Sequence, residues 1–213
     1  MVKEESQFNL AEPGASSQGG PRTQASRTAE TRAALLAAGR SLFAEHGFVG
    51  AAREDIVAKA GVTRGAMYHH FDSKQSLFQA VFEEVEAELC EAIAIAAVAS
   101  PDPVEQLRLG ATAFLERVSR PEVQRIVLLD APSVLDPHVR RELSERYGLG
   151  MVREALRAID SAGRLTLGPI GPLAAIMMAG MNEAATAIAE GADATDHIAI
   201  VLALIERVTV DAP

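Results

Sequence analysis

Apolar residues recur three and four positions apart along most of the chain, the spacing that places them on one face of an α-helix. No segment alternates apolar and polar residues over the length of a strand, and no Asn-Gly hairpin signal is present. The pattern therefore predicts an all-α protein. The longest regular stretch begins near Lys74 and should stop before Ser100, with apolar positions at Leu77, Phe78, Val81, Phe82, Val85, Leu89 and Ile93.

Glycines and capping residues divide the N-terminal part of this pattern into short helices. Gly47 and Gly61 are each followed by an apolar residue, which is typical of a helix C-terminus. Thr63 is expected to cap the helix after it, and Ser73 the long helix that begins near Lys74. The expected short helices span 28–46, 54–60 and 64–70.

Prolines divide the remainder of the chain. A proline has no backbone N–H and ends a regular helix, so the breaks are expected at Pro121, Pro132, Pro137 and in the loop 163–172. Five helical segments follow from these breaks, at about 103–119, 121–131, 137–161, 172–190 and 194–210.

Composition restricts the class of protein. The chain has 213 residues, of which 48% are hydrophobic, but no apolar run reaches the roughly 18 residues that a membrane span needs. Residues 1–26 are rich in Gly, Ser and Pro, and we expect them to form a disordered tail. The polar N-terminus does not look like a secretory signal, so we expect a cytoplasmic protein without a membrane partner. Cys90 is the only cysteine, which excludes an internal disulfide framework and favours a small buried residue over a redox sensor.

The charge is unevenly distributed. The whole chain has a formal net charge of −9, which alone would argue against a nucleic-acid partner. Residues 22–74, however, carry eight basic and five acidic residues, whereas residues 75–213 carry 11 basic and 21 acidic ones. This division suggests a basic N-terminal module on an acidic body.

The two short helices around Gly61 fit a helix-turn-helix. Such a motif needs a turn residue that tolerates positive φ, a small shared core, and an outer helix face of polar or short side chains. Ile56, Val57, Ala60, Val62, Met67 and Phe71 supply the expected core. Arg64, Gly65, Tyr68 and His69 supply the outer face, although Met67 and Tyr68 could each belong to the core.

At these positions the sequence resembles the DNA-binding domain of TetR-type transcriptional regulators. The resemblance covers residues of about 28–88 and rests on Leu-Phe-Ala-Glu-His-Gly-Phe at 42–48, Gly-Val-Thr-Arg-Gly at 61–65, Tyr-His-His-Phe at 68–71 and Ser-Lys at 73–74. It implies an all-α homodimer with a helix-turn-helix domain at 27–74 and a helical effector-binding and dimerisation domain at 75–213. The implied function is that of a repressor released from a palindromic operator in double-stranded DNA by a small-molecule effector, with no cofactor.

The resemblance also implies roles for individual residues. Arg64, Gly65, Tyr68 and His69 would lie at the major groove, and Arg53 near the DNA backbone or a base edge. Thr63, Tyr68, His70 and Lys74 would contact phosphates. Ala52 departs from the family pattern, in which a Thr or Ser at this position caps the helix with its hydroxyl group. The loss of this cap destabilises the helix by about 1 kcal/mol.

The acidic body offers less specific signals. The last two helices are apolar over more than one stripe, which favours a four-helix dimer interface over a purely intramolecular core. Asp130, Asn182 and Glu183 are polar groups on apolar segments, and Asp130 and Asn182 are the candidates for effector binding. The methionines around Met177 could line a pocket or be plain core.

Other functions find little support in the sequence. No phosphate-binding glycine loop, HExxH or GxSxG motif is present, so we do not expect an enzyme. The neighbours His69 and His70 point to different faces of a helix, so no metal site is expected there. A helical adaptor with a vestigial DNA module remains an alternative, supported only by Ala52.

Overall fold

The computed structural model describes residues 24–210, which fold into helices joined by short connections. Within these residues the only extended pairing is one antiparallel bridge between Leu165 and Thr209. No helix in this range is both long and apolar enough to cross a bilayer. The elements are α1 (Gln24–Gly50), α2 (Arg53–Ala60), α3 (Arg64–His70), α4 (Lys74–Ala97), α5 (Pro103–Val118), α6 (Pro121–Val123), the π-helix η1 (Gln124–Asp130), α7 (Ala131–Val134), α8 (Pro137–Arg146), α9 (Gly148–Ser161), α10 (Ile170–Ala189) and α11 (Ala194–Val208).

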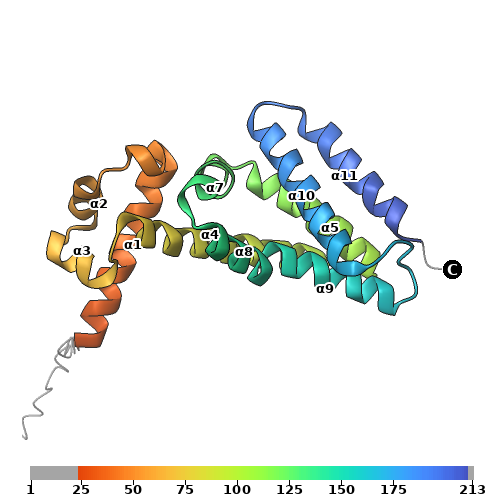
Figure 1. The fold of residues 1–213 in the computed structure, drawn as a ribbon, viewed down its shortest axis with the longest axis horizontal. Coiled ribbons are helices and arrows are strands. Elements are labelled where there is room, and N and C mark those ends of the chain that lie inside the picture. The colour runs from red at the N-terminus through yellow and green to blue at the C-terminus, as the bar shows by residue number, and fades with distance from the viewer. Residues whose placement is uncertain (1–23, 211–213) are drawn as a thin grey trace, which may run out of the picture.

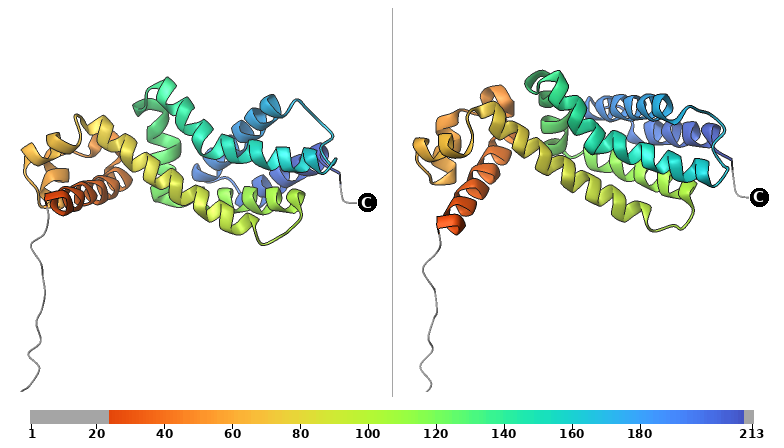
Figure 2. Two further views of the ribbon diagram at one scale, coloured as in Figure 1. Left: turned by 90° about the horizontal axis from the view of Figure 1, so that it is seen from below. Right: turned by 60° about the horizontal axis from the view of Figure 1, so that its bottom comes forward.

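The molecule is elongated and has two parts (Figure 1). Helices α1, α2 and α3 form a small head at one end, and α5 to α11 form a larger body. Helix α4 begins in the head and runs into the body, where it packs along α5 (Figure 2). Helices α10 and α11 lie at the side of the body remote from α3 (Figure 1).

The head is held by an aromatic cluster and by well-capped helices. Phe43, Phe48 and Phe78 meet with ring centroids 5.2–6.0 Å apart, and Ile56 and Met67 are fully buried beside them. Aromatic contacts of this kind add to the area that the side chains bury. At the start of α4, Ser73 and Ser76 form a reciprocal capping box. The core expected for the helix-turn-helix is therefore confirmed, with Val57, Ala60 and Val62 partly buried against it.

Several helix boundaries differ from the sequence-based expectation, most clearly the start of α1 and the segment 137–161. Helix α1 begins at Gln24, so residues 24–26 are helical, while residues 1–23 of the expected tail lie outside the described part of the chain. The single helix expected over 137–161 is wrong, because the chain breaks at Tyr147 (φ −109°, ψ −111°) between α8 and α9. Gly150 accommodates the break. A Cβ atom there would lie 2.4 Å from the carbonyl oxygen of Glu145, so only glycine permits this close approach of the two helices.

The break expected at Pro132 is wrong, because the helical run continues through it from the π-helix η1 into α7. Pro132 has no N–H to donate to the preceding turn, and η1 widens just ahead of it so that the Ala131 N–H reaches the carbonyl of Ile126. This wide turn directs Asp130 toward the head, where its carboxylate accepts a hydrogen bond from the backbone N–H of Phe48.

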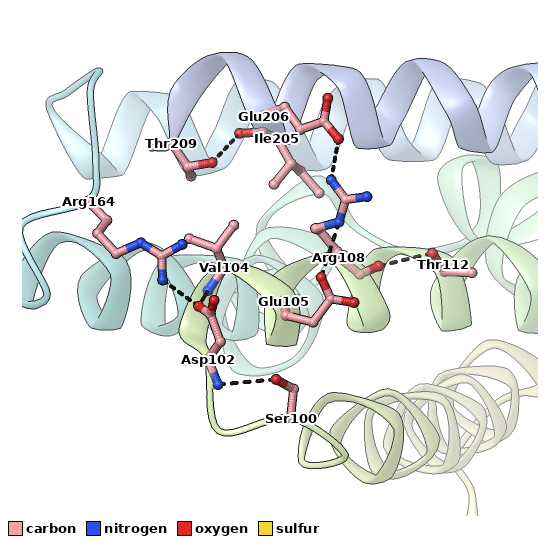
Figure 3. Close-up of polar contacts among 10 residues, drawn as sticks. All are labelled: Ser100, Asp102, Val104, Glu105, Arg108, Thr112, Arg164, Ile205, Glu206 and Thr209. Carbon is pink, nitrogen blue, oxygen red and sulfur yellow. Dashed lines mark hydrogen bonds and ion pairs between the residues drawn. The ribbon is translucent and has the colours of Figure 1, made fainter. Parts of the chain in front are cut away.

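A polar cluster (Figure 3) joins the helices at the end of the body remote from the head, where the α9–α10 connection and the end of α11 lie (Figure 1). Arg164, only 8% exposed, donates to Asp102 Oδ1 at 2.6 Å and to the carbonyl oxygen of Val210 at 2.7 Å. Asp102 also caps α5 through the N–H of Val104, and Arg164 lowers the pKa of the Asp102 carboxyl group. One guanidinium group thereby joins the start of α5 to the loop before α10 and to Val210 after α11.

Replacing Arg164 should destabilise the body. In Arg164→Ala, the Asp102 carboxylate and the Val210 carbonyl lose a buried partner, so we expect the free energy of unfolding in urea to fall by about 2 kcal/mol. Arg157→Ala is the control, because its ion pair with Glu154 is exposed on α9 and should contribute less than about 0.5 kcal/mol. Equal losses in the two variants would contradict this role of Arg164.

Candidate functional site

Helix α3 is built by the turn that precedes it. Gly61 ends α2 in the left-handed conformation (φ 66°, ψ 29°), and its N–H bonds to the carbonyls of α2. Thr63 then caps α3, with its Oγ1 accepting the N–H of Ala66 at 3.2 Å. Both features were expected from the sequence, and α3 has the predicted bounds of 64–70. The result is a short helix that begins at a fixed angle to α2.

One face of α3 has no protein covering. Arg64, Gly65, Tyr68 and His69 are all exposed, while Met67 on the opposite face is 1% exposed and belongs to the core. Tyr68, with 38% of its surface exposed, is at the edge of the outer face and not in the core. Helix α3 also lies at the end of the molecule that points away from the body (Figure 1). The outer face is therefore free to meet a large partner.

Arg53, Arg64 and Tyr68 form one arrangement between α2 and α3. The Arg53 guanidinium donates to the Tyr68 hydroxyl at 3.1 Å, and the Arg64 guanidinium lies 5.8 Å from the centroid of the Tyr68 ring. The interaction with Tyr68 raises the pKa of the Arg64 guanidinium above its ordinary value. Two permanent positive charges are thus held beside one aromatic ring on the exposed surface. Such groups bind phosphates and the edges of bases.

Thr63 and His70 border the exposed face of α3, and Ala52 leaves the N-terminus of α2 without a side-chain cap. The Thr63 oxygen already accepts the Ala66 N–H, so its hydroxyl hydrogen is free to donate outward. His70 is half-buried, and its ring lies against that of His69 at a centroid distance of 5.3 Å. Ala52 occupies the N-cap of α2 without a side-chain hydrogen bond, as the departure from the family pattern implied.

The Lys74 side chain points toward the end of α1 and away from the exposed face of α3. Its ammonium group donates to the carbonyl oxygens of Phe48 at 2.7 Å and Ala51 at 3.0 Å, and it lies 4.4 Å from the centroid of the Phe48 ring. Burial lowers the pKa of Lys74, helped by the nearby charge of Arg53. Two of its three donors therefore stabilise the end of α1, which leaves at most one for a phosphate.

Asp130 lies where the end of α1 meets η1. It is 8% exposed, accepts the Phe48 N–H at 2.6 Å and pairs with Arg125 at 3.3 Å. Asp130 does not line either of the two large cavities of the body. These contacts favour a structural role over the effector-binding role for which it was a candidate.

The body contains two neighbouring cavities. The proximal cavity, of about 640 Å³, lies among α4, α7, α8 and α10, and the distal cavity, of about 660 Å³, lies among α4, α5 and α9. Asn182 and Glu183 line the proximal cavity from α10, and both side chains are exposed. Met178 lines both cavities, so this methionine is cavity wall and not only core. The shared lining residues are Ile93, Phe114, Gly148 and Met178.

Glu86 is a residue of the proximal cavity that sequence reasoning missed. It lies four positions after Phe82 and three before Leu89, so it interrupts the apolar stripe of α4, and that interruption was a readable signal. Burial raises the pKa of Glu86 to about 7. Burial and the Glu86 charge together raise the pKa of Cys90, one turn away, to about 12. Cys90 is therefore a protonated thiol in the cavity wall, unsuited to fast redox chemistry.

No group of three His, Cys, Asp or Glu side chains within residues 24–210 is arranged to hold a metal ion. The arrangement consists instead of a positively charged exposed helix face at one end and cavities of mixed apolar and polar lining at the other. The first suits a polyanion, and the second suits a small organic molecule.

Two family models cover most of this architecture. Residues 35–81 match the model of bacterial regulatory proteins of the tetR family, which spans the helix-turn-helix. Residues 104–210 match a model described as tetracyclin repressor-like, C-terminal domain.

Individual relatives agree with the models. The HTH-type transcriptional repressor AcnR of Corynebacterium diphtheriae is 30% identical over 190 residues, which cover 83% of this chain and 90% of that protein. AcnR of Corynebacterium glutamicum is 31% identical over 130 residues, covering 58% and 69%. A crystal structure of a TetR-family transcriptional regulator from Pectobacterium atrosepticum has a TM-score of 0.71 and 33% identity, over 90% of this chain and all of that one.

Two glycines near α3 should respond in opposite ways to alanine. Gly61→Ala forces an alanine into the left-handed region and should lower the free energy of unfolding by about 1 kcal/mol. Gly65 lies in helical backbone, and a Cβ there would have no neighbour closer than 3.9 Å, so Gly65→Ala should raise stability by about 0.5 kcal/mol. Urea unfolding of both variants measures the difference. Destabilisation by Gly65→Ala would mean that the α3 face is not open.

Proposed function

Because the chain belongs to the TetR family of bacterial transcriptional regulators, we propose that it represses transcription by binding a palindromic operator as a homodimer and that a small molecule releases it. The protein is a DNA-binding regulator and not an enzyme. The observation that carries the proposal is the uncovered face of α3 at the tip of the molecule, with Arg64, Gly65, Tyr68 and His69 exposed together.

Gly65 supports a close approach of DNA to α3. Glycine in the first turn of a helix stabilises the fold less than alanine would, and no protein atom lies close enough to require a residue without a Cβ. A groove wall or phosphate lying against this position would explain why glycine is present there. In this arrangement Arg64 and Tyr68 reach base edges, while Thr63, His70 and Arg53 position the duplex through phosphates. Gly65→Ala should then weaken DNA binding although it does not weaken the fold.

The dimer follows from an apolar surface on α10 and α11. Ile176, Ile200 and Leu204 are 55–70% exposed, and Gly180 has no side-chain neighbour within 4 Å. Large apolar side chains in such a group mark a surface that a partner covers. Two copies joined here through a twofold axis would present their α3 helices to the same duplex, so that each would enter a successive major groove of a symmetric site.

Release by an effector rests on the connection between cavity and head. Helix α4 lines the proximal cavity with Phe82, Glu86 and Cys90 and holds the end of α1 with Lys74. A ligand that binds one setting of α4 better than another would shift the population between the two. If the favoured setting places the two α3 helices at the wrong separation, the dimer leaves the operator.

Arg64→Ala should relax base preference. When both proteins select duplexes from a random-sequence pool, the wild type should enrich a palindrome, and the variant should lose discrimination at one position in each half-site, by about 1–3 kcal/mol if Arg64 pairs with guanine. Affinity of the wild type should fall steeply with salt. Arg157→Ala, an exposed arginine on the body, is the control and should leave selection unchanged. Selection of the same palindrome at the same strength by Arg64→Ala would contradict the assigned contact, and failure of the wild type to select any sequence would favour the adaptor alternative.

Ile200→Glu should separate the dimer. A charge on each copy at the centre of the apolar surface is costly to bury, so sedimentation at micromolar concentration should show a species of monomer mass. Ile95→Glu is the matched control, because Ile95 is 66% exposed on α4, outside the α10–α11 surface. A dimer that survives Ile200→Glu and dissociates with Ile95→Glu would place the interface elsewhere.

A further inference from the structure

We propose that the proximal cavity binds an amphipathic organic cation, an apolar scaffold with one protonated amine, and that the amine pairs with Glu86. This inference rests on the proposed function, in which the body binds a small-molecule effector, and it names the chemical class of that effector. The argument uses the surroundings of Glu86, the other charges of the cavity, and the shape of the space beyond it.

Glu86 is a cavity carboxyl group without a partner of opposite charge. It lines the proximal cavity from the middle of α4 and is half-buried. No described residue forms a hydrogen bond or ion pair with it, although neighbouring Glu83 and Glu88 on the same helix pair with Arg146 and Arg40. A desolvated carboxylate left alone is costly, and a cation brought by a ligand would remove that cost.

The other ionisable groups of the cavity do not fill this role. Arg140 and Arg141 line it from α8, but both are exposed, and neither affects the pKa of Glu86, which burial alone raises. Glu183 faces the cavity from α10 and is exposed, and Cys90 carries no charge. The contributions of α5, η1 and α9 are apolar or glycine. An anionic ligand at the arginines would therefore share the cavity with the Glu86 carboxyl group, which is less exposed than they are.

The space next to Glu86 suits an apolar scaffold. Phe82, Leu89 and Phe114 line the proximal cavity, and Ile93, Phe114 and Met178 also border the distal cavity. The distal cavity is lined mainly by alanine, methionine, glycine and valine, and methionine adapts its shape to a bound group. Its polar lining residues are Gln106, Glu145, Arg146 and Glu154. An amine at Glu86 would leave the remainder of a ligand directed along this apolar wall.

A matched series of fluorescent probes tests the charge requirement. Pyrenemethylamine, pyrenemethanol and pyrenecarboxylate share one apolar scaffold and differ in charge, and the chain has no Trp to interfere with their emission. We expect the amine to bind the full-length dimer at least about tenfold more tightly than the alcohol at a pH above 7, and the carboxylate to bind most weakly. Equal binding of amine and alcohol, or preferred binding of the carboxylate, would overturn the proposal.

The pH dependence supplies a test that needs no variant. The amine stays protonated around neutral pH, whereas Glu86 must lose its proton to pair with it, so amine affinity should rise with pH and level off above about 7. Below that pH the affinity should fall by about tenfold per unit. A flat profile or one of opposite sign would contradict the assignment.

Glu86→Gln and Glu183→Gln form a matched pair of variants. Glu86→Gln keeps the shape of the side chain, and it should reduce amine binding to the level of the alcohol and remove the pH dependence, with the thermal melt confirming a folded protein. Glu183→Gln removes an exposed carboxylate of the same cavity and should leave the preference largely intact. Loss of the preference in Glu183→Gln and not in Glu86→Gln would place the site at the cavity mouth and overturn the role of Glu86.

DNA binding is measured separately, so that the two proposals fail in different ways. Amine binding that depends on Glu86 but does not change operator affinity leaves this inference standing and contradicts effector release. Operator binding without any preference for the amine leaves the regulator standing and overturns this inference.

Discussion

The position of the head on the body depends on the backbone groups that the break at Gly47 exposes. Gly47 adopts φ 70° and interrupts α1, so the Phe48 N–H and the carbonyls of Phe48 and Ala51 have to find partners outside the helix. Asp130 accepts the Phe48 N–H, and Lys74 donates to the carbonyls of Phe48 and Ala51. Each such group left unpaired would cost about 1–3 kcal/mol. The Arg125 guanidinium of η1 packs against this break, where a Cβ at Gly47 would lie 1.8 Å from it.

The two side chains that satisfy this break come from the two elements that also line the proximal cavity. Lys74 begins α4, which contributes Glu86, and Asp130 ends η1, which contributes Val127 and Leu128. Arg40 adds a further link from α1, with hydrogen bonds of 2.5 Å and 2.7 Å to Glu88 of α4 and one of 2.5 Å to Glu122 of α6. Movement of α4 or η1 around a ligand would therefore disturb the partners of the head directly, without a longer chain of contacts.

Local signals predicted the head well and the body less well. Gly61 and Thr63 act within a few residues, so the bounds of α3 could be read from the sequence, as could the exposed face of Arg64, Gly65, Tyr68 and His69. The partner of Asp130 lies 82 residues away in the chain, and the carbonyls bound by Lys74 more than 20, which no local pattern reveals. The break at Tyr147 had a signal in Gly148 and Gly150, but its cause is the approach of α8 to α9 in space. Glu86 was readable as a carboxyl in an apolar stripe, whereas the cavity around it required the fold.

The division of charge along this elongated molecule has a consequence for the encounter with DNA. Within the described residues, 24–74 carry seven basic and five acidic residues, whereas 75–210 carry 11 basic and 20 acidic ones, so the long axis of this part of the molecule is also an electric dipole. In the field of a polyanion such a dipole experiences a torque that turns its tip forward, while the acidic end is repelled. The protein would therefore approach DNA with α3 facing the duplex before any base contact forms. Salt would weaken this orientation as well as the affinity of the final complex.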